Sequence, residues 1–328
     1  MSVTPSQSKS HAVVIGASGF IGTRLVKRLA QQGKSIVAVD IAAPREQLPG
    51  VDYVNADVRR PLDLQIGSGA QALYNLAAVH RTPGHPAHEY FETNVLGAGH
   101  VTALAEACSI PLIVFTSSIS VYGPTEEVRT ESSLPVPTSD YGRSKLMAEM
   151  IHQMWFRAAP SRRLVTVRPG VVFGPGERGN YSALANALRR GVFFYPGRKD
   201  TVKSGGHVDE LLRTLEFAIA HSDRQILFNF AFPQVSATQD IVAAFSRVMN
   251  HRYRPATAPL PAVMLAACLF ESANALGLKT PIHRERVMKL VRSTRIAPQW
   301  LISQGYEFQF DLSSALECWA QETDGRFE

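Results

Sequence analysis

Cysteine is scarce in this chain, and the few that occur are not spaced for pairing or for metal binding. The 328 residues include Cys108, Cys268 and Cys318. An odd, sparse set does not build a disulfide framework and favours a reducing compartment, so we expect a cytoplasmic location. The histidines show no zinc-type spacing, and His85 and His88 lack suitably placed cysteine or acidic partners. We therefore expect no bound metal.

Long apolar runs are also missing. The first ten residues, MSVTPSQSKS, contain no apolar segment of the kind that a secretory signal needs, and we interpret residues 1–10 as a disordered lead-in. The longest apolar stretch, Leu260 to Phe270, contains a proline and is too short to span a bilayer, so we expect no transmembrane segment. We predict a buried helix there, with a helix on a membrane surface as the alternative.

Charge is modest and evenly spread. Charged residues make up 19% of the chain, the net charge is +6, and no basic run occurs. This balance suits an anionic ligand but gives no support to nucleic-acid binding. Because 45% of the residues are hydrophobic, the chain can bury a substantial core in one or two domains.

Short apolar runs alternate with amphipathic stretches in the first half of the chain. Ala12 to Ile15 predicts a buried strand, and Gly22 to Gln32 predicts a helix. Repetition of this unit indicates an α/β fold of the Rossmann type, a doubly wound parallel sheet covered on both faces. We assign residues 11–175 to a dinucleotide-binding domain. Residues 176–328 mainly form a smaller C-terminal substrate-binding lobe, with a strand near 226–230 returning to the main sheet.

A glycine-rich turn after the first predicted strand indicates a dinucleotide site. Gly16 permits the tight turn, Gly19 lets a pyrophosphate approach backbone amides, and Gly22 lets helix and sheet pack closely. The spacing is one residue longer than the usual fingerprint, but Asp40 follows at the tip of the second strand. Its carboxylate would bind the adenine ribose hydroxyls and repel a 2′-phosphate. We therefore expect NAD, and Arg45 keeps NADP as the alternative.

Two later strand ends extend this site. Asp57, in the segment NADV, could accept a hydrogen bond from the adenine amino group, or it could be a solvated turn residue. Leu76, Ala77 and Ala78 end the fourth strand with small residues, as needed where a dinucleotide crosses the sheet edge. The alternative for these three is a plain buried strand end.

Tyr141, Lys145 and Ser118 form the most informative pattern. Tyr141 and Lys145 are four residues apart and share a helix face. A phenol has a pKa of about 10, and we expect the lysine charge to lower it into a useful range. A serine hydroxyl, from Ser118 or its neighbour Ser117, would orient the phenol oxygen. Such a trio can move a hydroxyl proton while hydride passes to a nicotinamide.

Eight segments in order resemble the extended short-chain dehydrogenase/reductase family, in its NAD-dependent epimerase/dehydratase branch acting on nucleotide-linked sugars. They are GASGFIG, NADV, NLAA, NVLG, SSISVYG, YGRSK, RPGVVFGPG and HVDEL, and the resemblance runs from about Ala12 to Trp319. It implies that Tyr141 is the catalytic acid or base, that Lys145 also holds the nicotinamide ribose, and that Ser118 is the catalytic hydroxyl.

The predicted cofactor site combines the glycine turn, the strand ends and positions implied by the resemblance. Among the latter, Asn94 would support the helix on the cofactor side, and Pro169 and Gly170 would line the nicotinamide pocket. The complete predicted set is Gly16, Gly19, Phe20, Ile21, Gly22, Asp40, Asp57, Val58, Leu76, Ala77, Ala78, Asn94, Thr116, Tyr141, Lys145, Pro169 and Gly170.

Departures from the family pattern bear on the reaction. Family dehydratases carry an acidic pair where this chain has Ile119 and Ser120, so we expect no dehydration. Val171 replaces a frequent asparagine, and Asn180 could substitute for it or could be a helix N-cap. Lys203 stands near a position where many relatives grip the diphosphate with arginine. The predicted substrate-binding set is His80, Ser118, Ser120, Tyr141, Asn180, Lys203 and Arg292. For Arg292 the alternative is a surface cation, and for His80 a solvated loop.

These features favour an NAD-dependent epimerase that oxidises C4 of a nucleotide sugar, lets the keto sugar rotate, and reduces it again. We expect a UDP-linked substrate of surface-polysaccharide synthesis. One alternative is an NAD(P)H-dependent 4-ketoreductase of a nucleotide-linked 6-deoxy sugar, and another is a dehydrogenase of a hydrophobic alcohol or ketone. A non-catalytic dinucleotide-binding module would not need the retained trio. The resemblance also implies a homodimer, through the long helices predicted at residues 88–107 and 139–156.

Overall fold

The structure is a computed structural model that describes residues 12–66, 69–81, 84–251, 253–275 and 284–328. The predicted lead-in, residues 1–10, lies outside these ranges. Within them the chain divides into two compact units. The first unit contains the described residues of 12–123, 134–169 and 211–228, and the second contains those of 124–133, 170–210 and 229–328.

A seven-stranded sheet organises the first unit, in the order β11-β7-β5-β4-β1-β2-β3. The ladders from β7 to β3 are parallel. The predicted Rossmann-type α/β fold is therefore confirmed. The strands of this sheet are β1 (Ala12–Ile15), β2 (Ile36–Asp40), β3 (Val51–Asn55), β4 (Ala72–Asn75), β5 (Leu112–Thr116), β7 (Arg163–Pro169) and β11 (Gln225–Phe230).

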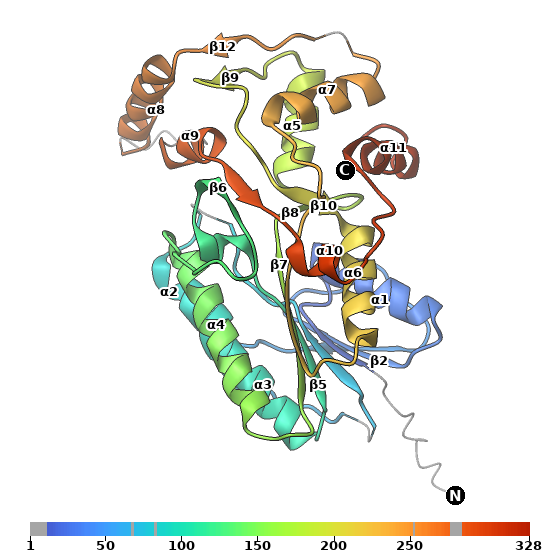
Figure 1. Cartoon of the computed structure of the whole chain (residues 1–328). Coiled ribbons are helices and arrows are strands. Elements are labelled where there is room, and N and C mark those ends of the chain that lie inside the picture. The colour runs from blue at the N-terminus through green and yellow to red at the C-terminus, as the bar shows by residue number, and fades with distance from the viewer. Residues whose placement is uncertain (1–11, 67–68, 82–83, 252, 276–283) are drawn as a thin grey trace, which may run out of the picture. The chain divides into compact units, whose positions relative to one another are not determined.

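Helices cover both faces of this sheet. Figure 1 shows α3 and α4 on one face, and α1 and α6 on the other. An ion pair of 2.5 Å between Arg28 of α1 and Glu216 of α6 joins the two helices of the second face. The helices of this unit are α1 (Phe20–Gln31), α2 (Ala87–Phe91), the π-helix η1 (Glu92–Leu96), α3 (Gly97–Ala107), the 3-10 helix η2 (Ile119–Tyr122), α4 (Asp140–Arg157) and α6 (Val208–Ala220).

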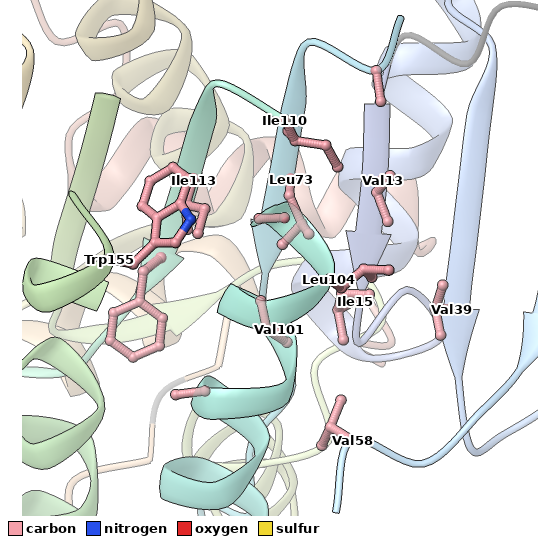
Figure 2. Packing of buried hydrophobic residues seen from close by; sticks show 14 of the residues in the cluster. Val13, Ile15, Val39, Val58, Leu73, Val101, Leu104, Ile110, Ile113 and Trp155 are labelled. Carbon is pink, nitrogen blue, oxygen red and sulfur yellow. The ribbon is translucent and has the colours of Figure 1, made fainter. Parts of the chain in front are cut away.

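The core beneath α3 and α4 holds the central strands in place. Leu73 and Ile113 lie on neighbouring strands and are fully buried, and Val101 and Leu104 of α3 pack against them (Figure 2). Trp155 of α4 closes the same cluster. Because apolar burial contributes about 25 cal/mol per Å², this cluster holds the later turns of α4 against the central strands.

The second unit has its own aromatic core. Phe173 stacks on Tyr181 at 4.3 Å between ring centroids, and Trp319 is fully buried beside them. Its strands form short pairs, β8 with β10, β9 with β12, and β6 with β13. Its elements are β6 (Thr125–Arg129), β8 (Val171–Phe173), α5 (Asn180–Arg189), β9 (Tyr195–Pro196), β10 (Gly205–His207), α7 (Thr238–Val248), β12 (Thr257–Ala258), α8 (Leu260–Ala275), α9 (Arg284–Val291), β13 (Thr294–Ile296), α10 (Gln299–Ser303) and α11 (Leu312–Glu322).

Helix α8 differs from the sequence expectation. The apolar stretch from Leu260 to Phe270 is helical, but it is not buried: Leu265 and Leu269 are each 65% exposed. The prediction of a buried helix is therefore wrong, because α8 packs against α9 but leaves several of its large apolar side chains exposed. Within those residues, no helix is long and apolar enough to cross a membrane.

Candidate active site

The end of β5 and the start of α4 bring the predicted catalytic residues together. Ser118 follows β5 and caps η2, its hydroxyl accepting from the Ser120 amide at 3.1 Å. Ser139 caps α4 in the same way, accepting from the amide of Gly142. A Cβ at Gly142 would lie 2.4 Å from the carbonyl oxygen of Ser120. Only glycine therefore lets α4 start this close to η2, and Tyr141 is brought to Ser118.

Ser118, rather than Ser117, is available to the phenol. A hydrogen bond links Tyr141 to Ser118 and lowers the pKa of the phenol. The Ser117 hydroxyl instead donates to the carboxylate of Glu149 at 2.5 Å and is buried. The geometry favours Ser118 of the two serines left open by the sequence. The Ser118 hydroxyl also donates to Ser120 Oγ at 3.1 Å, so Ser120 belongs to the same cluster.

The pKa of Tyr141 departs from the sequence expectation. Burial of the phenol removes it from water and raises its pKa to about 12, whereas the hydrogen bond with Ser118 acts in the opposite direction. We expected Lys145 to lower the pKa of Tyr141 into a useful range. This prediction is wrong for the protein chain alone, because the pKa is raised instead. The Lys145 ammonium is turned to the β5 backbone, where it donates to the Thr116 carbonyl at 2.8 Å. At neutral pH Tyr141 is therefore a proton donor, ready to protonate a keto oxygen.

Lys145 is held in a buried, partly aromatic site. Its Nζ lies 4.9 Å from the ring centroid of Phe115, and burial lowers its pKa to about 7. The nearby carboxylate of Glu149 acts in the opposite direction and raises that pKa. Near neutral pH the charge of Lys145 is thus set by the balance between desolvation and one buried anion.

The sequence analysis did not identify Glu149 or its ion-pair partner, Arg168. Glu149 receives two hydrogen bonds from Arg168 of β7, at 2.9 and 2.6 Å, and both side chains are buried. Arg168 also donates to the hydroxyl of Tyr122 at 2.8 Å. The spacing of Glu149, four residues after Lys145, was a usable signal because it places both on one face of α4. The network fixes β7, η2 and α4 around the catalytic residues.

His152, one turn further along α4, gives a prediction about acid stability. Its ring stacks on Phe115 at 4.2 Å, Nδ1 donates to the Ala148 carbonyl, and burial lowers its pKa to about 4. As the pH falls from about 6.5 to about 4, the unfolded chain takes up a proton that the folded chain does not, so stability decreases. The full loss is about 3 kcal/mol. We expect His152→Gln to flatten the fall in unfolding free energy over that range; equal slopes for both proteins would contradict this.

The glycine turn after β1 has the geometry that a pyrophosphate requires. Gly16 has a φ of 84°, and a Cβ there would lie 2.6 Å from the Ala77 amide nitrogen. A Cβ on Gly22 would lie 2.1 Å from the Gly16 carbonyl oxygen. Helix α1 starts after Gly19 with no side-chain cap and no acidic residue in its first turn, which includes Phe20. These amides and the positive end of the helix dipole fit an anionic ligand.

Asp40 and Asp57 occupy the strand ends predicted for them. Asp40 ends β2, and its carboxylate accepts from the amides of Ser18 and Ala42, both at 2.9 Å. The Asp57 carboxylate is bound by Arg59, with the shortest contact at 2.6 Å, and this hydrogen bond lowers its pKa. The two carboxylates therefore differ: Asp40 shapes the turn after β1, whereas Asp57 already has a cationic partner.

Further predicted cofactor positions line the same edge of the sheet. Asn94, buried in η1, bonds both backbone groups of Val79 at 3.1 Å and donates to Ser144 of α4. It therefore ties the end of β4 to the catalytic helix. The buried Thr116 hydroxyl has no partner among the described residues, as expected of a group that meets a ligand. Leu76, Ala77 and Ala78 are partly exposed after β4, and Val58 is buried beneath η1 and α3.

Ile21, Pro169 and Gly170 complete the predicted cofactor positions. Ile21 is in the first turn of α1, and Pro169 is the last residue of β7. Gly170 donates its amide to the carbonyl of Phe230 at 2.8 Å, and a Cβ on it would lie 2.4 Å from the Ser204 carbonyl oxygen. The residues of the first unit that the structure describes thus fit a dinucleotide.

The predicted substrate residues are divided between the two units. In the first unit, His80 follows β4, and its pKa is lowered by desolvation and by the charges of Arg81 and Lys145. Asn180, Lys203 and Arg292 belong to the second unit. Asn180 is the first residue of α5, whose N-cap is Gly179, so the alternative that Asn180 is an N-cap is wrong.

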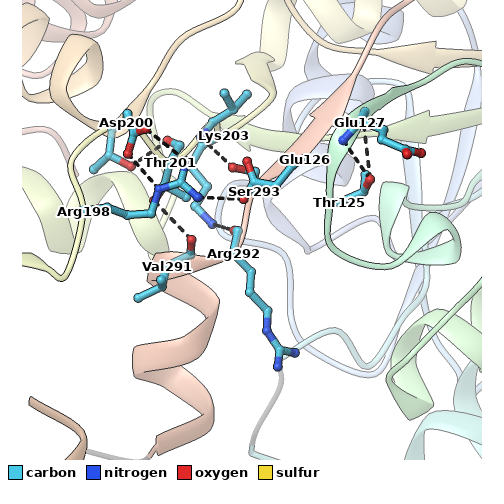
Figure 3. Close-up of polar contacts among 12 residues, drawn as sticks. Thr125, Glu126, Glu127, Arg198, Asp200, Thr201, Lys203, Val291, Arg292 and Ser293 are labelled. Carbon is cyan, nitrogen blue, oxygen red and sulfur yellow. Dashed lines mark hydrogen bonds and ion pairs between the residues drawn. The ribbon is translucent and has the colours of Figure 1, made fainter. Parts of the chain in front are cut away.

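Lys203 has a structural role in its own unit. Its ammonium donates to the carbonyls of Lys289 and Arg292, at 2.5 and 2.6 Å, and so binds the C-terminal end of α9. Burial lowers its pKa to about 8. Figure 3 shows the Arg292 guanidinium directed away from Lys203. Sequence analysis missed Arg295, whose Nε is buried with no partner among the described residues, a better position for meeting an anion.

Comparison with known proteins identifies the family of the chain. A family model described as the NAD dependent epimerase/dehydratase family matches residues 12–230. The N-acetyl-alpha-D-glucosaminyl-diphospho-ditrans,octacis-undecaprenol 4-epimerase of Escherichia coli O157:H7 is 28% identical over 316 residues, covering 94% of this chain and 93% of that protein. Short-chain dehydrogenase/reductase family 42E member 1 of Xenopus laevis is 26% identical over 221 residues, 63% of this chain and 57% of that protein.

Solved structures show the same fold. MoeE5 in complex with UDP-glucose and NAD has a TM-score of 0.74 and 23% identity, with 96% of this chain and 99% of that chain covered. The UDP-glucuronic acid 4-epimerase of Bacillus cereus in complex with NAD has a TM-score of 0.74 and 18% identity, with 97% and 99% covered. The family match spans the dinucleotide turn and the Ser118, Tyr141 and Lys145 cluster. The chain therefore belongs to the NAD-dependent epimerase/dehydratase family and is an enzyme of the extended short-chain dehydrogenase/reductase type.

Proposed function

We propose that the chain is an NAD-dependent 4-epimerase of a sugar carried on a diphosphate. The observation that carries this proposal is the cluster at the end of β5, where Tyr141 contacts Ser118 and Lys145 is held by the β5 backbone. This cluster shares the sheet edge with the glycine turn. A bound NAD would supply the hydride acceptor and donor that oxidation and re-reduction at C4 require.

The residues of this chain supply the proton transfers. As the phenolate, Tyr141 would remove the C4 hydroxyl proton in the first half-reaction; as the phenol it would return that proton to the keto oxygen in the second, and Ser118 would orient that oxygen. The raised pKa of Tyr141 opposes the first step and suits the second, because a protonated phenol is needed there. Ile119 is buried and apolar, and Ser120 is not ionised, so neither performs the proton transfer that dehydration requires.

Two carriers of the sugar are supported by different observations. A UDP-linked sugar of surface-polysaccharide synthesis is the substrate that the motifs favour, and solved neighbours are complexes with UDP-glucose or UDP-glucuronic acid. A polyprenyl diphosphate is favoured by the Escherichia coli relative, which aligns over nearly the whole chain. We further propose that the enzyme acts as a homodimer in the cytoplasm and prefers NAD to NADP.

The cofactor preference is testable at Asp40. Asp40→Asn removes the charge and keeps one oxygen, which can accept from only one of the two amides, Ser18 or Ala42, that now donate to different oxygens of Asp40. We expect NAD affinity to fall about tenfold through loss of charge-assisted hydrogen bonds, and NADP affinity to rise. Titration calorimetry with both dinucleotides measures the ratio of affinities. An unchanged ratio would show that Asp40 does not select the cofactor.

The proposed function is tested by incubating the purified enzyme with UDP-N-acetylglucosamine and, separately, with its polyprenyl-diphosphate counterpart. Proton NMR of the released sugar follows inversion at C4 without added reduced cofactor. Inversion with either carrier supports a 4-epimerase, and the faster reaction identifies the carrier. Turnover that requires stoichiometric NADH or NADPH and a keto sugar would replace this proposal with the ketoreductase alternative.

A further inference from the structure

Helix α8 presents an apolar face whose side chains are exposed in the described part of the chain. Leu265 and Leu269 are one turn apart, each 65% exposed, and Phe270 is 39% exposed beside them. The charged residue on the described part of α8, Glu271, is bound by Arg284 of α9 at 2.6 Å. We call the exposed residues the α8 face: Pro261, Ala262, Leu265, Ala266, Cys268, Leu269 and Phe270.

Basic side chains flank this face. Figure 1 shows α9 next to α8 within the second unit, and the two helices pack together. Helix α9 carries Arg284, Arg286 and Lys289, all exposed. Arg284 pairs with Glu271 of α8 and Lys289 pairs with Glu285, so the three cations outnumber the two acids beside them. Leu290 of the same helix is 50% exposed, so the apolar surface continues onto α9. An apolar helix face beside exposed arginine and lysine is the combination that binds the surface of an anionic bilayer.

We propose that the α8 face docks this enzyme on a membrane surface that contains anionic lipid. Helix α8 has 16 residues and is about 24 Å long, shorter than the apolar thickness of a bilayer, so it would lie in the interface rather than cross it. The leucines enter the acyl boundary while the α9 cations meet lipid phosphates. The purpose rests on the proposed function: a polyprenyl-diphosphate sugar is presented at such a surface.

A second copy of the chain is the competing occupant, and another face suits it better. Helix α4 carries Met147, Met150 and Met154, which are 44%, 52% and 71% exposed and follow one another at helical spacing. These methionines form an apolar stripe on α4, with one exposed cation toward each end: Arg143, which pairs with Asp140, and Arg157. At α8 the cations instead come from a second helix packed beside the apolar side chains, so membrane contact is the better match there.

Vesicle flotation tests the proposal with the whole chain. We expect the protein to float with vesicles of phosphatidylglycerol and phosphatidylcholine, and to bind about tenfold less to phosphatidylcholine alone or at high salt. Leu265→Glu with Leu269→Glu should reduce flotation at least about tenfold. The matched control is Leu134→Glu with Val136→Glu, because these residues are 80% and 59% exposed in the first unit. The control should float like the wild type.

Three outcomes would overturn the proposal: no flotation of the wild-type protein, equal flotation of the α8 variant, or an α8 variant that becomes a monomer while the wild type is a dimer by light scattering. Thermal unfolding confirms that both double variants are folded. Flotation does not depend on turnover, so failure of epimerisation leaves this result intact. With a soluble UDP-sugar both double variants should keep wild-type activity, whereas a polyprenyl substrate in vesicles should be slowed only by the α8 changes.

Discussion

Tyr141→Phe is expected to lower the rate of C4 epimerisation at least about a hundredfold, the usual scale for a positioned acid–base group. The substitution removes one oxygen and leaves the ring in place, so the fold should not change. The Ser118 hydrogen bond and the proton carried at this position are lost together. Steady-state kinetics on the accepted substrate measure the loss as a fall in kcat.

Ser120→Ala is the matched control for this variant. Ser120 belongs to the same cluster, where its hydroxyl accepts from Ser118, whereas the hydrogen bond to the phenol comes from Ser118. We expect it to change kcat by less than about tenfold, in line with the loss of one neutral hydrogen bond. Tyr141→Phe should bind NAD as the wild type does. Near-normal turnover of Tyr141→Phe would show that a different group moves the proton.

Glu149→Ala is expected to destabilise the protein by about 3–5 kcal/mol, because it leaves the Arg168 guanidinium buried without its carboxylate. It should also lower the pKa of Lys145, which Glu149 raises, and so reduce the charged fraction of that lysine at neutral pH. Chemical denaturation measures the first effect. The pH dependence of kcat/KM measures the second, as a shift of its alkaline limb to lower pH.

The double variant Glu149→Leu with Arg168→Met separates the ion pair from the packing. It fills the site with apolar groups and should recover most of the lost stability, since a buried pair can often be replaced at little cost. Activity should not recover with it, because Lys145 would still lack its neighbouring anion. A double variant that is as unstable as Glu149→Ala would mean that the pair itself stabilises the fold.

The sheet and the cofactor turn could be predicted because their signals are local. A buried apolar run predicts a parallel strand, and Gly16 and Gly22 stand where a Cβ would meet backbone at 2.6 and 2.1 Å. The Ser118 and Tyr141 cluster was predictable from the family spacing. Asn94 was predicted to support the helix on the cofactor side. In the structure it hydrogen-bonds Val79 after β4 and Ser144 of α4, and so links these two segments.

What the sequence could not predict depends on contacts between distant segments. Arg168 follows Glu149 by 19 residues and meets it only because β7 lies next to β5. Desolvation of Tyr141 depends on everything packed around it, so the expected effect of Lys145 was overestimated. The exposure of α8 was equally hidden, because an apolar helix has the same composition whether it is covered by protein or not.

Tracing the hydrogen at C4 with a deuterium label tests the central claim most directly. The substrate is prepared with deuterium at C4 and converted in ordinary water, and the product is analysed by mass spectrometry and NMR. The account predicts that the inverted sugar keeps its C4 deuterium, because the same hydride returns to the other face. Loss of the label to solvent would contradict oxidation and re-reduction at the Tyr141 site.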